Sequence, residues 1–465
     1  MAHAVDRFIR APHQESYDLI VIGSGPGGQR AAVQAAKLGK TVLVVERNRL
    51  GGSCLNLGTI PSKALREAAL SSAPGSVGIG PVMARTRRVI QEEAVVIEDA
   101  LTRNKIDVVS GKASFVDSAS LEIVNDAGTY RVRAEKIVIA SGARPKRPPD
   151  LNFDGLVLFD SDTILDLNRQ PNRLLVLGAG VVGCEYASIF ARMGVKVTLV
   201  EGRDDILPTL DKEIVAALLA QLKKAGVEVR TGTQFVSIKK NAAQQAAVEF
   251  TSVAGRSTET FEAVLYCLGR TGNIEDLNLS AIGVQANNRG VIEVNGNYQT
   301  KVPTIYAVGD ITGSPGLAAS SSEQGRLAAL HAFTGASAEF PDTFPYGVYT
   351  IPEISSVGFT QAQMLEKKVE FVVGKAEYAE LARGKMLQDE YGFLKLVVHA
   401  KTRRIVGIHI IGISATELVH IGQVAIYFGA KVEFFVENVF NYPTLAEAYK
   451  VAAHNAINQL PPFRG

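Results

Sequence analysis

The chain has 465 residues, of which 46% are hydrophobic and 21% charged, and its formal net charge is +2. This composition is ordinary for a globular protein, and the length predicts about three domains. The near-neutral charge does not indicate nucleic-acid binding, and no apolar run approaches the roughly 18 residues of a membrane-spanning helix. Residues 1–16 lack the apolar core of a secretory signal, so we expect a flexible arm there. Three cysteines are too few for a disulfide scaffold, which favours a cytoplasmic location.

A nucleotide-binding fingerprint begins at residue 18. Residues 18–28 predict an apolar strand that runs into Gly23-x-Gly25-x-x-Gly28, and a helix follows over about 27–38. A second strand, 41–46, ends in Glu46, at an offset of 46 − 28 = 18 from the last glycine. In such units the glycines allow a tight turn and close approach to a pyrophosphate, and the acid binds a ribose hydroxyl. Taken alone, the pattern is also compatible with a tight turn that binds nothing.

The same fingerprint recurs in the middle of the chain. Residues 174–183 repeat it with Gly178, Gly180 and Gly183, and the next strand ends in Glu201, where 201 − 183 is again 18. Each copy also has a later apolar strand that ends in glycine, at 137–142 and at 264–269. The interpretation as a turn that binds no ligand would therefore have to account for a whole repeated domain. Two sites in one chain indicate two dinucleotides, most simply a flavin and a nicotinamide that exchange a hydride.

The rest of the chain predicts how these units are connected. Residues 300–310 form another strand that ends in Gly-Asp, and we infer that the chain returns there to the first unit. The predicted fold is α/β, with one Rossmann-like dinucleotide-binding domain (151–272) inserted into another (1–150 and 273–341). The proline-rich run 144–149 is interpreted as the exit linker. Residues 342–465 alternate short strands with helices at about 414–429 and 445–459 and have no phosphate loop, which predicts an α+β domain for packing and association.

The segment 51–63 resembles the flavin disulfide reductase family. It reads Gly-Gly-Ser-Cys-Leu-Asn-Leu-Gly-Thr-Ile-Pro-Ser-Lys, and the family carries two cysteines there that form a redox disulfide over the flavin. Here the first is Cys54, but Thr59 stands at the second position; near the C-terminus Tyr442 replaces the family's catalytic histidine, while Glu447 is kept. Because threonine cannot form a disulfide and an unperturbed tyrosine is a poor base, disulfide reduction is not expected. Cys54 is then interpreted as a small, partly buried residue, the alternative being a reactive thiol with a lowered pKa.

One group within this family, the soluble pyridine nucleotide transhydrogenases, resembles the chain more narrowly. The shared stretches include 58–66, 440–444 and 446–449, and the likeness spans about residues 17–460. It implies non-covalent FAD as cofactor and hydride transfer between NAD(H) and NADP(H). The FAD-binding domain would then be 1–150 with 273–341, the NAD(P)-binding domain 151–272 and the dimerisation domain 342–465. One nicotinamide dinucleotide would reduce the flavin and leave, and a second would then take the hydride. It also implies a homodimer or higher homo-oligomer, in which Tyr442 and Glu447 close the flavin pocket of a second subunit.

The resemblance also assigns roles to particular residues. Lys63 and Glu185 are expected to meet beside the reactive flavin nitrogen, the alternative being two solvated helix charges. Asp310 is expected to hold the ribityl chain, and it could also be a helix N-cap. The catalytic set is then Cys54, Thr59, Lys63, Glu185, Tyr442 and Glu447. The expected cofactor-binding residues are Gly23, Gly25, Gly28, Glu46, Arg47, Gly52, Ser53, Lys63, Ala113, Gly142, Gly178, Gly180, Gly183, Glu201, Arg203, Gly269, Asp310 and Ala318.

The end of the second fingerprint leaves the preference between the nicotinamide cofactors open. An acid such as Glu201 accepts from the ribose hydroxyls of NAD(H) and repels the 2′-phosphate of NADP(H). Arg203 could pair with that phosphate, or it is a surface cation paired with Asp204 or Asp205. No cluster of histidines and cysteines has metal-ligand spacing, so no metal is predicted.

Three other functions stay open at this point. An NAD(P)H diaphorase or quinone reductase would share the flavin reduction and differ in the acceptor. A non-catalytic flavoprotein is disfavoured by the presence of Lys63 and Glu185, and a lipoamide dehydrogenase is disfavoured by Thr59. The expected partners are nicotinamide dinucleotides and further copies of the chain, without nucleic acid or membrane.

Overall fold

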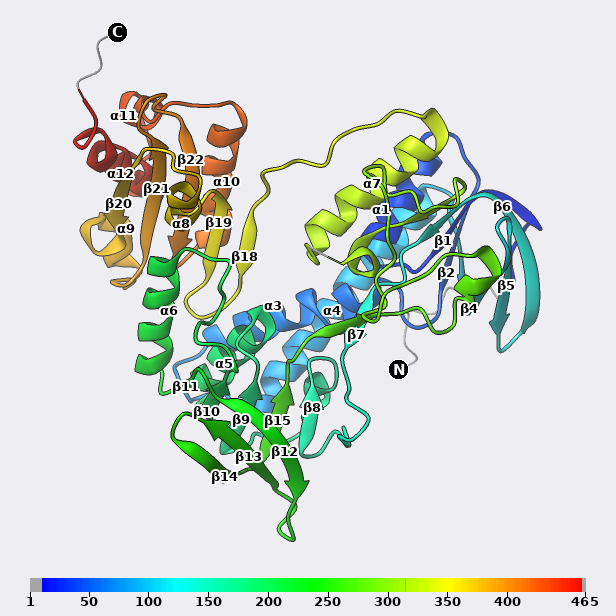
Figure 1. Ribbon diagram of the computed structural model, residues 1–465, viewed down its shortest axis with the longest axis horizontal. Helices are drawn as coiled ribbons and strands as arrows, with labels where there is room; N and C mark the ends of the chain where they lie inside the picture. The colour runs from blue at the N-terminus through cyan, green and yellow to red at the C-terminus, as the bar shows by residue number, and fades with distance from the viewer. Residues whose placement is uncertain (1–10, 314, 462–465) are drawn as a thin grey trace. The chain divides into compact units, whose positions relative to one another are not determined.

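The computed structural model describes residues 11–313 and 315–461, and the chain divides into two compact units (Figure 1). The first unit contains the described parts of Met1–Ala68, with Ile79–Arg169 and Leu268–Phe340. The second contains Ala69–Gly78, Gln170–Cys267 and the described part of Pro341–Gly465. Most of the arm expected over 1–16 lies outside the described residues. The domain boundaries given above stay predictions.

A mostly parallel sheet forms the first unit. Its strands follow the order β3-β2-β1-β6, all parallel, and β6-β5-β4 continue as an antiparallel meander. Strand β17 pairs in parallel with β6, which confirms that the chain returns to this sheet after the second fingerprint. Elements of the unit are β1 (Ser16–Ile22), α1 (Pro26–Lys37), β2 (Val42–Glu46), α2 (Gly52–Asn56), α3 (Thr59–Leu70), α4 (Ile79–Arg103), β3 (Asp107–Ser110), β4 (Lys112–Asp117), β5 (Ser120–Asn125), β6 (Gly128–Ile139), β7 (Ala143–Pro145), β8 (Leu158–Asp160), η1 (Thr163–Asp166), β16 (Arg270–Gly272), η2 (Leu279–Ile282), β17 (Ile305–Ala307), η3 (Gly309–Thr312) and α7 (Ala318–Thr334).

Two close packings position the glycine turn of this unit. Helices α1 and α7 touch through glycines, since a Cβ on Gly325 would stand 2.0 Å from the carbonyl oxygen of Gly27. The segment that follows β6 and the segment at the start of the returning chain pair with each other as the antiparallel strands β7 and β16. The start of the predicted linker is therefore a strand, because its backbone N–H and C=O groups find partners in 270–272.

The second unit holds a parallel sheet and an antiparallel sheet. Strands β11-β10-β9-β15 are parallel and lie beside the β12-β13-β14 meander. Strands β18-β19-β22-β21-β20 form the antiparallel sheet. Elements of the unit are β9 (Arg173–Leu177), α5 (Val181–Arg192), β10 (Lys196–Val200), α6 (Lys212–Lys224), β11 (Glu228–Arg230), β12 (Gln234–Lys240), β13 (Ala246–Ser252), β14 (Gly255–Phe261), β15 (Ala263–Tyr266), β18 (Tyr346–Val348), β19 (Ile354–Gly358), α8 (Gln361–Glu366), β20 (Phe371–Glu377), η4 (Tyr378–Glu380), α9 (Ala382–Met386), β21 (Phe393–His399), β22 (Ile405–Ile411), α10 (Ala415–Tyr427), α11 (Glu433–Glu437) and α12 (Glu447–Ile457).

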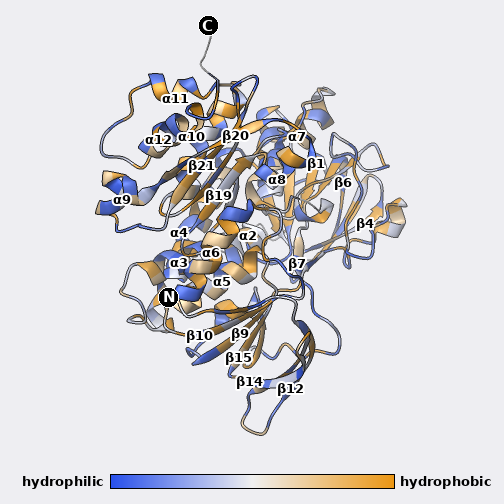
Figure 2. Cartoon of the chain, turned by 60° about the vertical axis from the view of Figure 1, so that its left-hand side comes forward, coloured by the Kyte–Doolittle hydropathy of each residue, from blue (hydrophilic) through white to orange (hydrophobic). Residues whose placement is uncertain are grey.

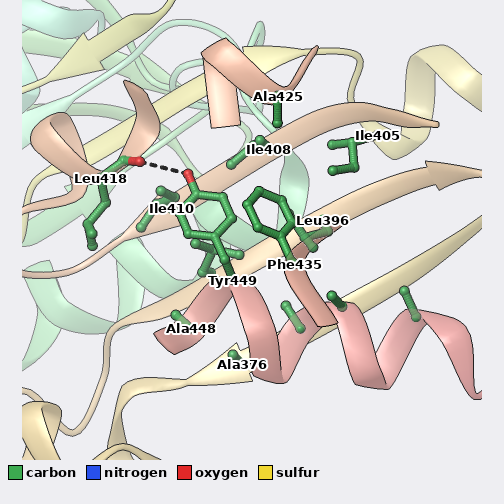
Figure 3. Packing of buried hydrophobic residues seen from close by; sticks show 14 of the residues in the cluster. Ala376, Leu396, Ile405, Ile408, Ile410, Leu418, Ala425, Phe435, Ala448 and Tyr449 are labelled. Atoms are coloured by element: carbon green, nitrogen blue, oxygen red, sulfur yellow. Dashed lines mark hydrogen bonds between the residues drawn. The ribbon is translucent and has the colours of Figure 1, made fainter. Parts of the chain in front are cut away.

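Apolar packing holds these layers together. The strands around β9, β10 and β15 are largely hydrophobic in Figure 2, as expected for parallel strands that are buried on both faces. The antiparallel sheet packs against α10 and α12 around Phe435 and Tyr449 (Figure 3). The buried Tyr449 hydroxyl donates to the carbonyl oxygen of Leu418 at 2.7 Å, so its polar atom is satisfied inside the core. Helices α10 and α12 confirm the two helices predicted in this region.

A buried charge cluster joins α6 to the antiparallel sheet. The ammonium group of Lys395 on β21 is fully buried; it lies 2.8 Å from the Asp211 carboxylate and 3.1 Å from that of Glu213, and it donates to Gln361. Asp211 is also the N-cap of α6 and accepts from the N–H of Glu213 at 3.1 Å. Burial raises the pKa of Asp211, but the hydrogen bond from Lys395, the charges of His409 and Lys395 and the N–H of Glu213 together outweigh it, and the pKa lies below its usual range. This cluster fixes the start of α6 to β21.

Among the described residues, no helix is both long and apolar enough to cross a bilayer. The same part of the chain holds no group of three or more histidine, cysteine or acidic side chains placed to bind a metal ion.

Candidate functional site

The first glycine turn joins β1 to α1, and its glycines serve different purposes. Gly23 has φ +103°, a left-handed conformation, and a Cβ there would stand 2.4 Å from the carbonyl oxygen of Ala140. A Cβ on Gly28 would stand 1.9 Å from the Gly23 oxygen, so α1 lies directly on the turn. Gly25 is the N-cap of α1, and a Cβ there would meet nothing within 4 Å. No side chain caps this helix, so its first N–H groups and the space beside Gly25 fit a pyrophosphate.

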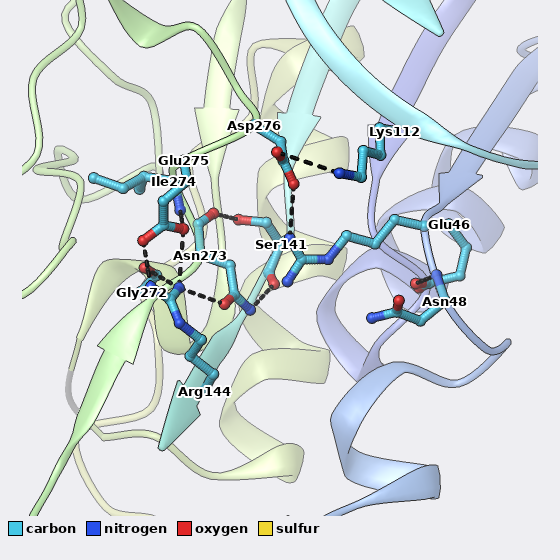
Figure 4. Close-up of polar contacts among 11 residues, drawn as sticks. Glu46, Asn48, Lys112, Ser141, Arg144, Gly272, Asn273, Ile274, Glu275 and Asp276 are labelled. Carbon is cyan, nitrogen blue, oxygen red and sulfur yellow. Dashed lines mark hydrogen bonds and ion pairs between the residues drawn. The ribbon is translucent and has the colours of Figure 1, made fainter. Parts of the chain in front are cut away.

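Glu46, at the end of β2, fixes the backbone of this turn through hydrogen bonds to Ser24. Its Oε2 accepts from the N–H of Ser24 at 2.9 Å and from the Ser24 hydroxyl at 2.7 Å. Its Oε1 accepts from the N–H of Asn48 at 2.9 Å (Figure 4). An ionised carboxyl offers about four acceptor positions, so one remains for a ribose hydroxyl. Ser24 is not among the expected site residues, and its place between the first two glycines was the signal that could have identified it.

The segment after Glu46 lies against the glycine turn. Gly52 has φ +60°, and a Cβ there would stand 3.0 Å from the Cα of Gly25. Helix α2 therefore begins in contact with the turn, and it carries the half-buried Ser53. Glycine at position 52 allows the two backbones to come this close, because a side chain there would crowd the backbone of Gly25.

The two positions of the family's disulfide lie side by side. The Thr59 side chain forms a hydrogen bond with the Cys54 thiol across the α2–α3 junction. Burial raises the pKa of that thiol, the charge of Asp310 adds to the effect, and Thr59 and Lys63 oppose it without reversing it. The thiol is therefore neutral near pH 7, which is contrary to the lowered pKa that a reactive cysteine requires.

Asp310 presents a carboxylate without a hydrogen-bond donor in the described chain. It lies half-buried in η3, whose N-cap is Val308, so the alternative N-cap role of Asp310 is wrong. Its nearest cation is Arg270, with 3.9 Å between Nε and Oδ2, and Arg270 also donates to the carbonyl oxygen of Ala143 at 2.6 Å. Burial raises the pKa of Asp310, and Arg270 opposes this. Such a carboxylate is suited to accept from the hydroxyl groups of a ligand.

The other expected residues of the first unit lie in strand β4, at the start of helix α7 and next to strands β7 and β16. Ala113 is buried in β4, and Ala318 is the first residue of α7. Gly142 and Gly269 have φ values of +67° and +101°, and a Cβ on either would meet nothing within 4 Å. Their open surroundings leave room for a ligand at both strand ends.

Arg47 already has a protein partner. Its Nη1 lies 3.1 Å from the Asp276 carboxylate, which Lys112 also approaches at 3.7 Å (Figure 4). Contact of Arg47 with a cofactor stays a prediction.

The second glycine turn repeats the construction of the first. Gly178 has φ +99°, and a Cβ on Gly183 would stand 1.8 Å from the Gly178 oxygen. Gly180 is the N-cap of α5, no side chain caps that helix, and a Cβ there would meet nothing within 4 Å. The two turns thus offer the same open position at the start of a buried helix.

Glu201 is held like Glu46, with one difference in its donors. Its Oε2 accepts from the N–H of Ala179 at 2.9 Å and its Oε1 from the N–H of Arg203 at 3.1 Å. The Arg203 guanidinium forms a bidentate pair with the same carboxylate, here called the fork, with Nε 3.0 Å from Oε1 and Nη2 3.1 Å from Oε2. Burial raises the pKa of Glu201, but these hydrogen bonds outweigh it, and the pKa lies below its usual range. Arg203 is therefore paired with Glu201, and the expected alternative of Asp204 or Asp205 is wrong.

Glu185 is not a solvated helix charge. It is 3% exposed in α5, and its Oε1 accepts from the N–H of Tyr349 at 2.9 Å. One turn further on, the Ser188 hydroxyl oxygen accepts from the N–H of Ile351 at 3.1 Å. The segment 349–351 is thereby bound along α5. Lys63 belongs to the other unit, where its ammonium group donates to the Ser62 hydroxyl at 3.3 Å, and its expected pairing with Glu185 stays a prediction.

The C-terminal residues of the expected site belong to a stretch of sequence that carries exposed apolar side chains. Tyr442 is 75% exposed, and Glu447 begins α12, where its carboxylate accepts from the N–H of Thr444 at 3.3 Å. Several further large apolar side chains in this region are exposed: Val424, Tyr427, Phe428, Phe434 and Val439. Exposed large apolar side chains of this kind are typical of a protein–protein interface where they form one surface.

Known proteins match almost the whole chain. Residues 17–325 match the family described as pyridine nucleotide-disulphide oxidoreductase, and residues 344–453 match its dimerisation domain. A protein of Mycobacterium bovis named soluble pyridine nucleotide transhydrogenase is 44% identical over 461 residues, covering 96% of this chain and 98% of its own. One of the same name from Pseudomonas aeruginosa is 40% identical over 463 residues, covering 96% and 99%.

Solved structures show the same fold. The HOCl-induced flavoprotein disulfide reductase RclA from Escherichia coli superimposes with a TM-score of 0.87 at 27% identity, covering 94% of this chain and 99% of that one. LpdA from Mycobacterium tuberculosis superimposes with a TM-score of 0.86 at 26% identity, covering 94% and 99%.

Proposed function

Because this chain belongs to the pyridine nucleotide-disulphide oxidoreductase family, we propose that it transfers hydride between NAD(H) and NADP(H) with the help of bound FAD. The observation that carries the proposal is the repeated glycine turn, in which Gly25 and Gly180 leave the same open position at two helix starts. The relatives named soluble pyridine nucleotide transhydrogenase, which match 96% of this chain, support the same activity.

The residues of the first unit fit FAD. The turn at Gly25 would bind the pyrophosphate, Glu46 the adenosine ribose, and Asp310 the ribityl hydroxyls, since its carboxylate accepts no hydrogen bond from the described chain. When bound, FAD supplies the site that accepts and returns a hydride. The turn at Gly180 would bind the nicotinamide dinucleotides, each in turn.

The proposed reaction uses no thiol. In support, Thr59 stands beside Cys54 where a second sulfur would be needed, and burial keeps the thiol protonated. Lys63 and Glu185 are proposed to orient the reacting rings, and Tyr442 and Glu447 to complete the site from a second subunit. The three cysteines form no disulfide among the described residues, in support of a reducing, cytoplasmic location.

Replacing the thiol therefore has a small expected effect. Cys54→Ser should change the rate of hydride transfer between nicotinamide dinucleotides little, because the thiol neither carries electrons nor exchanges a proton. The measurement is steady-state transfer by the FAD-loaded variant beside the parent protein. A loss of about 100-fold or more, the size expected for a catalytic acid–base group, would contradict the thiol-free reaction.

The acceptor distinguishes a transhydrogenase from a diaphorase. We expect anaerobic NADH to bleach the flavin of the purified protein, and NADP⁺ or NAD⁺ to restore its absorbance within the time of one turnover. Rapid reoxidation by a quinone together with slow reoxidation by either nucleotide would instead identify a quinone reductase. A flavin that NADH does not bleach would overturn both functions.

A further inference from the structure

The end of β10 carries a charge arrangement that the first glycine turn lacks. Glu46 and Glu201 each accept a hydrogen bond from the backbone N–H of the residue between the first two glycines of its turn. Each also accepts one from the backbone N–H of the residue that follows the acid by two positions. The remaining donor to Glu46 is the neutral hydroxyl of Ser24. The remaining donors to Glu201 belong to a cation, the Arg203 guanidinium. The two acids are alike in place, and among the described residues only the second is paired with a cation.

The fork uses all the acceptor capacity of Glu201. Two backbone N–H groups and two guanidinium N–H groups fill the roughly four positions of a carboxylate, and its side chain is 7% exposed. A ribose hydroxyl can therefore bind Glu201 only in place of the guanidinium. In contrast, the Arg203 side chain is 56% exposed, and the N–H groups of Nη1 make no hydrogen bond within the described chain.

We infer that Glu201 and Arg203 form an exchangeable pair that lets one site accept both NAD(H) and NADP(H). The inference deepens the proposed function and rests on it. With the fork closed, the guanidinium compensates the charge of Glu201 and offers its outer N–H groups to a 2′-phosphate. With the fork open, Glu201 accepts from the ribose 2′- and 3′-hydroxyls.

Neighbouring charges set the balance between the two states. Asp204 and Asp205 follow Arg203 directly and are exposed, so they disfavour a 2′-phosphate. The backbone on either side of the pair is fixed, since the carbonyl oxygen of Arg203 accepts from the N–H of Gly232 at 2.8 Å and Glu201 N–H donates to the Arg230 oxygen at 2.9 Å. Exchange of partners therefore requires only rotation of the Arg203 side chain.

Binding of nucleotide fragments tests the pair without hydride transfer. The probes are adenosine 2′,5′-bisphosphate and 5′-AMP, which differ only in the 2′-phosphate, titrated calorimetrically into the FAD-loaded protein. We expect Arg203→Gln to weaken the bisphosphate by about tenfold or more and to leave 5′-AMP unchanged or tighter. Glu201→Gln should weaken 5′-AMP and leave the bisphosphate unchanged or tighter, while Arg203→Lys should keep part of the bisphosphate affinity.

A matched control separates this role from a structural one. Arg230→Gln removes a similar arginine–glutamate pair, with Glu259, from the neighbouring strand β11, and should leave both affinities unchanged. The inference is overturned if Arg203→Gln weakens both fragments equally or affects neither. If the fragment results are as expected but no hydride passes between NADPH and NAD⁺, the pair stands and the proposed function fails.

Discussion

Gly180→Ala is expected to remove most of the nicotinamide-dependent activity while FAD remains bound. The backbone at Gly180 is extended, with φ −75° and ψ −173°, and a Cβ there would meet nothing within 4 Å, so the fold accommodates alanine. The added methyl group would instead stand where the nicotinamide dinucleotide's pyrophosphate approaches the start of α5. The methyl group should displace the bound dinucleotide by roughly 1 Å, and we therefore expect kcat/KM for NADH to fall by about 100-fold.

The equivalent substitution in the first turn should have the opposite pattern. Gly25→Ala should yield a folded protein that has lost its FAD, because that position is equally open. Gly296→Ala adds a methyl group to an exposed glycine that also has no neighbour within 4 Å, and should change neither property. Absorbance measures the amount of bound FAD, and stopped-flow reduction of the flavin by NADH measures the reaction with the nicotinamide dinucleotide. Loss of flavin from Gly180→Ala, or unchanged reduction by NADH, would contradict the assignment of the two turns.

Lys395→Met is expected to cost about 3–5 kcal/mol of unfolding free energy. The substitution leaves the Asp211 carboxylate buried, at 3% exposure, without its 2.8 Å partner. Lys375 is the control, since it lies directly opposite Lys395 on β20 and also pairs with Glu213, but is 32% exposed. Lys375→Met should cost no more than about 1 kcal/mol. Denaturant unfolding followed by circular dichroism measures both, and equal costs would contradict the importance of burial.

The cost should depend on pH in a defined direction. The pKa of Asp211 is lowered in the folded protein, so its pairing stabilises fully above the unfolded-state pKa, about 3.9, and the stabilisation is lost as pH falls through the folded-state value. The difference between the parent protein and Lys395→Met should therefore be largest near neutrality and shrink below about pH 4. The double variant Lys395→Met with Asp211→Asn should lose less unfolding free energy than the sum of the losses in the two single variants.

The repeated architecture could be predicted because local sequence determines it. Each glycine turn needs particular glycines for steric reasons that act within a few residues, as at Gly28 and Gly183, and the acid follows at a set distance. The return of the chain at β17 was predictable for the same reason. The apolar strand followed by Gly-Asp resembles the parallel strands β1 and β6, each of which also runs into a glycine, and it pairs in parallel with β6.

What could not be predicted depends on side chains that meet from distant parts of the chain. Lys395 appears in the sequence as an ordinary strand lysine, and only the fold brings it to Asp211. Likewise Glu185 was expected only as a charge near the flavin, and its bond to the N–H of Tyr349 joins residues 164 positions apart. The Arg203 fork is local but was missed in favour of Asp204 and Asp205, because rotamer choice and burial are not visible in a sequence.

Hydride transfer from NADPH to thio-NAD⁺ by the purified, FAD-loaded protein tests the central claim most directly, with NADH as donor in parallel. The account predicts rapid formation of thio-NADH from both donors, since Arg203 compensates the charge that would exclude the 2′-phosphate. Transfer from NADH alone, with flavin that NADPH does not reduce, would contradict it.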